Sequence, residues 1–181
     1  MPYTIEKHNH RLAAWAASTS ASASPLCRFK VEVGVAVLEN SGFTAEAFAI
    51  ANTLPTPAQL DVKHAGWRET VINSAQAQGR TFTHGIAAKL INCYLKVRFV
   101  CAGEHLHERV RALHPPIDAL LLAALAQANF GGQAMKWRNF HNLRWSKFDS
   151  ATYQAVINLM RESMPAGDPL WKIEEYWEGH Q

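Results

Sequence analysis

A glycine-containing turn in front of a lysine is the first feature of the sequence that suggests chemistry. Gly85, Ile86 and Ala87 follow His84 at the start of a strongly periodic segment, and Lys89 comes two positions later. The first N–H groups of a helix have no partner inside the helix, and the helix dipole makes this end positive, so a helix start can bind a phosphate. A simple turn without a ligand also explains the glycine. His84 to Ala87 are therefore candidate DNA-phosphate contacts.

Lys89 and Asp118 are the candidates for a catalytic pair. An amine near a helix N-terminus in a partly apolar cleft has its charged form disfavoured, and the neutral amine is a nucleophile. A carboxylate stabilises positive charge that develops in a transition state. Taken alone, Lys89 is also explained as a solvated surface lysine, and Asp118, which follows Pro115 and Pro116, as a helix cap.

The segment from His84 to Leu95, HGIAAKLINCYL, resembles the hairpin signature of the helix-hairpin-helix DNA glycosylases of the HhH-GPD superfamily. In that family, a turn with a glycine, a branched apolar residue and a small residue leads into a helix that bears the catalytic lysine. The matching residues are Gly85, Ile86, Ala87, Lys89 and Asn92. The segment departs from the family at His84, where many members have proline, and at Ala87, where most have a second glycine.

A second segment, HPPID from His114 to Asp118, resembles the family's segment in which a branched apolar residue precedes the essential aspartate at a helix start. Lys89 and Asp118 are separated by 29 positions, more than in the best-known members and comparable with the archaeal 8-oxoguanine branch. The resemblance implies a DNA glycosylase, with or without lyase activity, in which Lys89 forms a Schiff base and Asp118 stabilises the transition state.

The resemblance implies a monomeric enzyme that needs no cofactor and acts on double-stranded DNA carrying a damaged or modified base. The base is either an oxidised purine, in base excision repair, or a hypermodified phage base, in antiviral defence. Two other readings remain open. The first is a non-catalytic helix-hairpin-helix module that binds duplex DNA. The second is a zinc-stabilised helical interaction domain.

The elements that must position these residues are helices. Apolar residues recur at steps of three and four, and β-branched alternation is nearly absent, so the sequence predicts an all-α fold in one domain over residues 1–181. The helix-hairpin-helix element spans about 64–100, and the helix that begins with Asp118 lies within about 114–128. Expected helices are Asn9–Ser20, Arg28–Glu39, Thr44–Thr53, His64–Gln78, Ile86–Val100, Ala102–Arg111, Ile117–Ala128, a helix from Asp149 or Ser150 to Ser163, and a last one after Asp168.

Basic and aromatic residues alternate between Lys136 and Phe148, without an acidic residue. Basic groups hold phosphates and aromatic faces stack on bases, and a glycosylase needs an aromatic wall for the base that it extrudes. A helix that turns these aromatics into the core explains the pattern as well. The candidates for contact with the extruded base are Trp137, Phe140, Trp145 and His114.

Composition and cysteine spacing bear on the partner, the cellular location and the cofactor of the protein. The net charge of +3 is too small to identify a nucleic-acid partner by itself. Three cysteines match neither a disulfide framework nor an iron–sulfur site, and no apolar run has transmembrane length, so we expect a cytoplasmic protein without membrane contact. A zinc site is not expected from the cluster of Cys101, Glu104, His105, His107 and His114, because its spacing lacks the usual ligand pairs.

Overall fold

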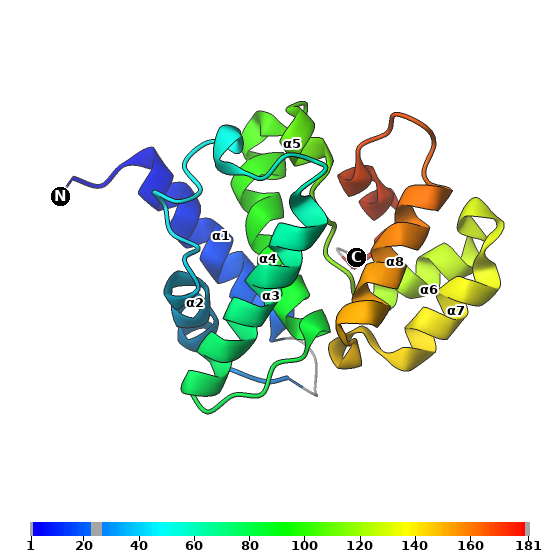
Figure 1. Cartoon of the computed structure of the whole chain (residues 1–181), viewed down its shortest axis with the longest axis horizontal. Coiled ribbons are helices and arrows are strands. Elements are labelled where there is room, and N and C mark those ends of the chain that lie inside the picture. Colours follow the sequence, from blue (N-terminus) through cyan, green and yellow to red (C-terminus); the bar gives the residue numbers. More distant parts are fainter. Residues whose placement is uncertain (1, 23–26, 180–181) are drawn as a thin grey trace.

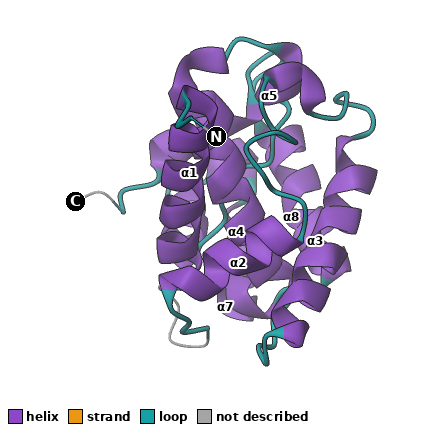
Figure 2. Cartoon of the chain, turned by 90° about the vertical axis from the view of Figure 1, so that its left-hand side faces the viewer, coloured by secondary structure: helices purple, strands orange, loops and turns teal. Residues whose placement is uncertain are grey.

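Helices form the regular structure of the chain, which is described here by a computed structural model covering residues 2–22 and 27–179. Figure 2 shows helices joined by loops, and no strand occurs among these residues. The α-helices are α1 (Ile5–Ala21), α2 (Val31–Asn40), α3 (Leu60–Ala77), α4 (His84–Leu95), α5 (Glu108–Arg111), α6 (Ala119–Gln127), α7 (Ala134–Leu143) and α8 (Ser150–Ser163). Shorter helical segments are η1 (Ala51–Thr53), η2 (Lys96–Glu104, a π-helix), η3 (Phe130–Gly132), η4 (Trp145–Lys147) and η5 (Leu170–Tyr176). The expectation of an all-α chain is confirmed for the described residues.

Two groups of helices lie side by side (Figure 1). The first contains α1 to α5, and the second contains α6, α7, α8 and the C-terminal segment η5. The extended segment 112–118 leads from one group to the other. Buried apolar side chains form one core that draws on both groups.

The central element of the first group is α4. Every residue from Gly85 to Leu95 is buried, and the helix packs against α1, α3, η2 and η4. A helix that is covered on all sides lies in the interior of a fold. Because Lys89 lies on this helix, its ammonium group is enclosed by protein and needs a partner of opposite charge.

The structure differs from the expected helix boundaries in several places. The first helix begins at Ile5 because Thr4 caps it, and its hydroxyl accepts a hydrogen bond from the Lys7 N–H. The third expected helix, Thr44–Thr53, is wrong: the segment makes turns and ends in η1. Here the rings of Phe43 and Phe48 stack with centroids 4.8 Å apart in the core.

The expected helix-hairpin-helix element corresponds to α3 and α4 with the turn between them, although α3 starts four residues earlier than expected. The periodic segment after Lys89 stays helical beyond Leu95, but changes to a π-helix that ends at a positive φ of Gly103. The last expected helix is the 3₁₀ segment η5. None of the helices in the described part of the chain is long and apolar enough to span a membrane.

Candidate active site

Lys89 and Asp118 meet between the two groups of helices. The Lys89 Nζ atom lies 2.9 Å from Asp118 Oδ2, and the lysine is 6% exposed. A charged side chain this deeply buried is retained only with a partner of opposite charge. The structure therefore brings together the two residues that the sequence separated by 29 positions.

Asp118 uses its two carboxylate oxygens for different contacts. Oδ1 accepts a hydrogen bond of 2.9 Å from the N–H of Leu121 and so caps α6. Oδ2 faces Lys89 and also accepts a hydrogen bond of 2.9 Å from the indole N–H of Trp177. The capping role that the sequence offered for Asp118 is present, and the same side chain also forms an ion pair with Lys89.

The ionisation of this pair corrects one expectation. Burial opposes the charged form of Lys89, but the hydrogen-bonded Asp118 carboxylate favours it, and the pKa of the lysine lies above its ordinary value. Burial likewise opposes the Asp118 carboxylate, whose pKa is nevertheless lowered by Lys89 and the Leu121 N–H. The pair is an ammonium and a carboxylate. The sequence suggested a free amine at Lys89, whereas in the unliganded protein this residue is charged.

Asn92 fixes the distance between the two charged residues. It lies one helical turn beyond Lys89 on α4, and its side-chain amide donates a hydrogen bond of 2.9 Å to the carbonyl of Pro115, three residues before Asp118. A single side chain therefore ties the helix that carries Lys89 to the chain that enters α6. Asn92 is fully enclosed, and its amide oxygen accepts a hydrogen bond from His64.

A buried polar network continues from Asn92 to α8. Arg68 donates to His64 Nδ1 at 2.7 Å, so His64 carries its proton on Nε2 and gives it to Asn92. The Tyr153 hydroxyl donates to His114 Nδ1 at 3.0 Å, and His114 Nε2 donates to Asp61 at 2.9 Å. Arg161 completes the network with two hydrogen bonds of 2.7 Å to Asp61.

Both histidines of this network are neutral because burial lowers their pKa values, and neighbouring positive charges on Arg68 and Arg161 add to the effect. In the unfolded chain, they titrate near 6.5. Below that pH the unfolded chain binds protons that the folded chain refuses, so stability present above pH 6.5 is lost as the pH falls. The free energy of unfolding should therefore fall with decreasing pH, by at most on the order of 1 kcal/mol per pH unit for each histidine, until the folded-state pKa is reached.

Urea unfolding at pH 7.5, 6.5 and 5.5 measures this dependence. His64→Gln should make the decline between pH 6.5 and 5.5 less steep, even if the variant is less stable at every pH. The matched control is His8→Gln, at an exposed position of α1, which should leave the decline unchanged. Equal slopes for wild type and His64→Gln would show that the network does not control acid stability.

A pocket of about 120 Å³ opens beside Lys89. Its polar lining comes from Lys89, Lys96, Glu174 and Ser20, and the indole of Trp177 forms one side. Glu174 pairs with Lys96, and burial raises the pKa of its carboxyl group. The Lys96 ammonium group also lies 5.7 Å from the centroid of the Trp177 ring. The remaining lining residues are Ala16, Cys93, Val97 and Pro116.

Sequence reasoning missed Trp177, Glu174 and Lys96. The first two lie in the C-terminal segment, more than fifty residues beyond Asp118, and only the path of η5 back across the site brings them to Lys89. Lys96 lies two helical turns after Lys89, which places it on the same side of the helical rod. That spacing was the one signal in the sequence that pointed to it.

The four residues expected to touch an extruded base lie elsewhere. Trp137 is fully buried with its indole N–H bonded to the carbonyl of Phe130, and Phe140 packs against the core. His114 belongs to the buried network. Trp145 comes nearest to the site: Lys89 Nζ lies 6.0 Å from its ring centroid, although the indole is only 8% exposed. The pocket lining includes none of the four.

Three of the four residues expected to contact a DNA phosphate, at positions 84 to 87, are buried instead of open to a ligand. Gly85, Ile86 and Ala87 are buried, and the loop that contains Trp145 covers the start of α4. The Gly85 N–H donates to the carbonyl of Phe148, and the Ile86 N–H donates to the Thr83 hydroxyl. These backbone donors are used inside the protein, so the physical basis for binding a phosphate there is missing from this structure.

The cluster of histidine, cysteine and glutamate residues around positions 101–114 is dispersed. Glu104 accepts a hydrogen bond from the N–H of Ala51, and His107 caps α5 and contacts Asn52. No group of three or more potential metal ligands occurs within residues 2–22 and 27–179.

No protein-family model, curated protein or solved structure matches this chain.

Proposed function

We propose that this protein is a DNA glycosylase of the helix-hairpin-helix type. The observation that carries the proposal is the buried contact of 2.9 Å between Lys89 Nζ and Asp118 Oδ2 beside a pocket. The resemblance implies these two residues as nucleophile and carboxylate. The succession of α3, a turn and α4 agrees with the hairpin that the resemblance implies.

The pair supplies both functions that cleavage of an N-glycosidic bond requires. As the bond between the base and the sugar C1′ breaks, the sugar gains positive charge, which the Asp118 carboxylate stabilises. The bonding electrons leave with the base, which takes up a proton from the Lys89 ammonium group. The amine then forms a bond with C1′. The bond between C1′ and the ring oxygen breaks, that oxygen takes up a proton released by the nitrogen, and a Schiff base results. Asp118 enters the reaction as a carboxylate, because Lys89 and the Leu121 N–H lower its pKa.

The pocket next to Lys89 is the site that we assign to the base. Trp177 offers an aromatic face, and the Lys96–Glu174 pair offers both hydrogen-bond donors and acceptors for a base edge. A cavity of about 150 Å³ accepts one benzene ring, and the pocket of about 120 Å³ is smaller than this, so it holds no more than one ring. A purine therefore requires the C-terminal segment that carries Trp177 to move outward.

The proposal is tested with duplex oligonucleotides that each carry one modified base, with oxidised, alkylated and glucosylated bases represented. The full chain is incubated with each duplex, and alkali then cleaves the strand wherever a base has been removed. We expect scission at the modified position for at least one class. Binding to these duplexes without scission of any would favour a non-catalytic helix-hairpin-helix module instead.

The same panel of modified duplexes distinguishes a role in repair from a role in defence. Release of an oxidised purine assigns the enzyme to base excision repair, whereas release of a glucosylated base assigns it to antiviral defence.

A further inference from the structure

The start of α4 is covered by the loop that follows α7. Besides the bond from the Gly85 N–H to Phe148, the hydroxyl of Thr83 donates a hydrogen bond of 2.9 Å to the carbonyl of Ser146. The loop and the helix start are therefore tied together at two points. A phosphate at this helix end would have to displace the chain's own hydrogen bonds.

Gly85 permits this close contact. A Cβ atom at this position would lie 1.8 Å from the carbonyl oxygen of Trp145, a backbone atom that cannot turn aside. The glycine of the hairpin is thus required for approach of the loop, which accounts for it without any bound phosphate.

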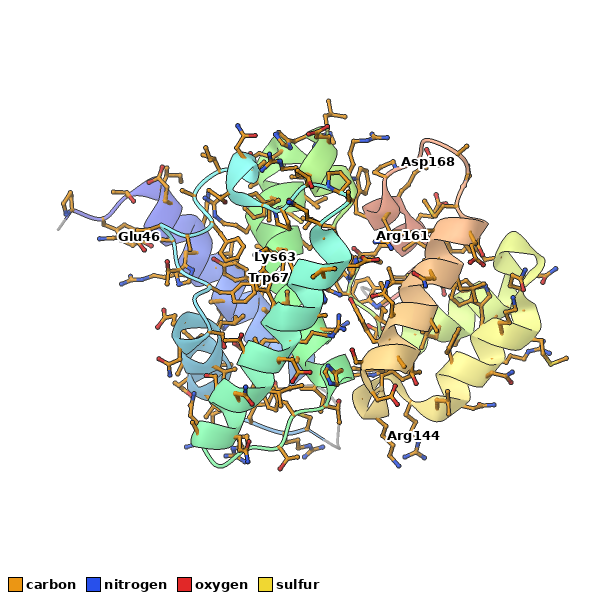
Figure 3. The ribbon with its side chains drawn as sticks, in the orientation of Figure 1. Glu46, Lys63, Trp67, Arg144, Arg161 and Asp168 are labelled. Carbon is orange, nitrogen blue, oxygen red and sulfur yellow. The ribbon has the colours of Figure 1, made fainter. Side chains whose placement is uncertain are left out.

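The covering loop turns its aromatic residues inward and its basic residues outward. Trp145 and Phe148 are buried, whereas Arg144 and Lys147 are exposed. Figure 3 shows Arg144 at the end of the molecule where this loop lies, with its side chain directed into solvent. The sequence has no acidic residue between Asp118 and Asp149, so no carboxylate of this stretch competes for the two cations.

Arg144 has a strained backbone. Its φ of 64° and ψ of 113° lie in a region that glycine adopts far more easily than any residue with a Cβ atom. A strained residue persists where the surrounding structure enforces it, and such residues gather at functional sites. An arginine at a position that suits glycine indicates that its side chain has a function.

The loop is also adjacent to the catalytic lysine. The residue after Arg144 is Trp145, whose ring centroid lies 6.0 Å from Lys89 Nζ. A backbone phosphate near the nucleotide that enters the site would therefore lie within reach of this loop.

We propose that Arg144 and Lys147 form the phosphate-binding element of the DNA interface and take the place of the backbone N–H groups of α4. The inference rests on the proposed function, because it assumes that the substrate is DNA. Arginine binds phosphate through paired N–H donors, and lysine binds it as a point charge.

Salt dependence of DNA binding provides the test. The affinity of the full chain for a fluorescent 20-base-pair duplex, a length of about two helical turns, is measured by anisotropy over a range of NaCl concentrations. Each phosphate contact contributes about 0.9 to the slope of log affinity against log salt. Arg144→Gln together with Lys147→Gln should therefore reduce the slope by about 1.8.

Two further variants separate charge from structure. Lys63→Gln removes one exposed positive charge on α3, at a distance from Arg144 (Figure 3), and should leave the slope at the wild-type value. Arg144→Gly removes one charge and relieves the strained backbone, so its melting temperature should rise while its slope falls by about 0.9. A merely structural role of Arg144 predicts a normal slope for Arg144→Gly.

The outcomes distinguish the inference from the proposed function. If the wild-type chain binds DNA with a salt dependence that the Arg144 and Lys147 variants share, the phosphate contacts lie elsewhere and the inference is wrong. If the wild-type chain does not bind duplex DNA, the proposed function fails, and the inference fails with it.

Discussion

Asp118→Asn is expected to reduce the rate of base excision by about 10²–10³-fold, the usual effect of removing one electrostatic stabiliser of a transition state. Asparagine is as good a helix cap as aspartate, so its amide oxygen can still accept the Leu121 N–H. It has no negative charge to oppose the positive charge on the sugar. The measurement is the single-turnover rate of base release, with DNA affinity and thermal unfolding recorded in parallel.

The matched control for this change is Asp149→Asn. Asp149 caps α8 through a hydrogen bond of 2.7 Å from the Thr152 N–H, but it is exposed and has no ion-pair partner among the described residues. It therefore tests the effect of replacing a capping aspartate with asparagine away from the pocket, and wild-type excision is expected. Full activity of Asp118→Asn would mean that the carboxylate only caps α6.

Lys89→Gln is expected to abolish covalent trapping on DNA. Borohydride reduces a Schiff base to a stable amine, so wild-type protein mixed with a duplex that contains an abasic site should give a cross-linked species on a denaturing gel. Glutamine has no amine that can form the Schiff base. The cross-linked species should fall to background.

Two controls keep this result interpretable. Lys172 lies 2.9 Å from Asp168, the same separation as in the buried pair, but on the surface, and Lys172→Gln should trap normally. Removing one member of a buried ion pair costs about 3–5 kcal/mol, so circular dichroism must show that Lys89→Gln is folded. Trapping of a folded Lys89→Gln protein at the wild-type level would assign the nucleophile to another amine.

The helical class and the choice of Lys89 and Asp118 could be read from the sequence. Apolar spacing reflects which side of a helix faces a core, and it predicted most helices to within a few residues. The two charged residues were singled out because the short segments around Gly85 and Ile117 resemble signatures of the helix-hairpin-helix DNA glycosylases. Their assignment to catalysis stays a prediction.

Local patterns were least informative where a residue's environment comes from distant parts of the chain. Between Lys136 and Phe148, spacing could not tell a base-stacking wall from a core face, and packing turned Trp137 inward. The sequence suggested His114 as a contact for the base, but the side chain is buried and forms hydrogen bonds with Asp61 and Tyr153.

The sequence alone determined which residues have suitable chemistry and which segments are helical, because both depend on residue types and on neighbours within a few positions. Tertiary structure decided that Lys89 is an ammonium group rather than a free amine, because that depends on the nearby Asp118 carboxylate. It also decided that Trp177 forms a side of the pocket and that the start of α4 is covered. Long-range contacts set charge states, pocket walls and access, and no local pattern in the chain encodes them.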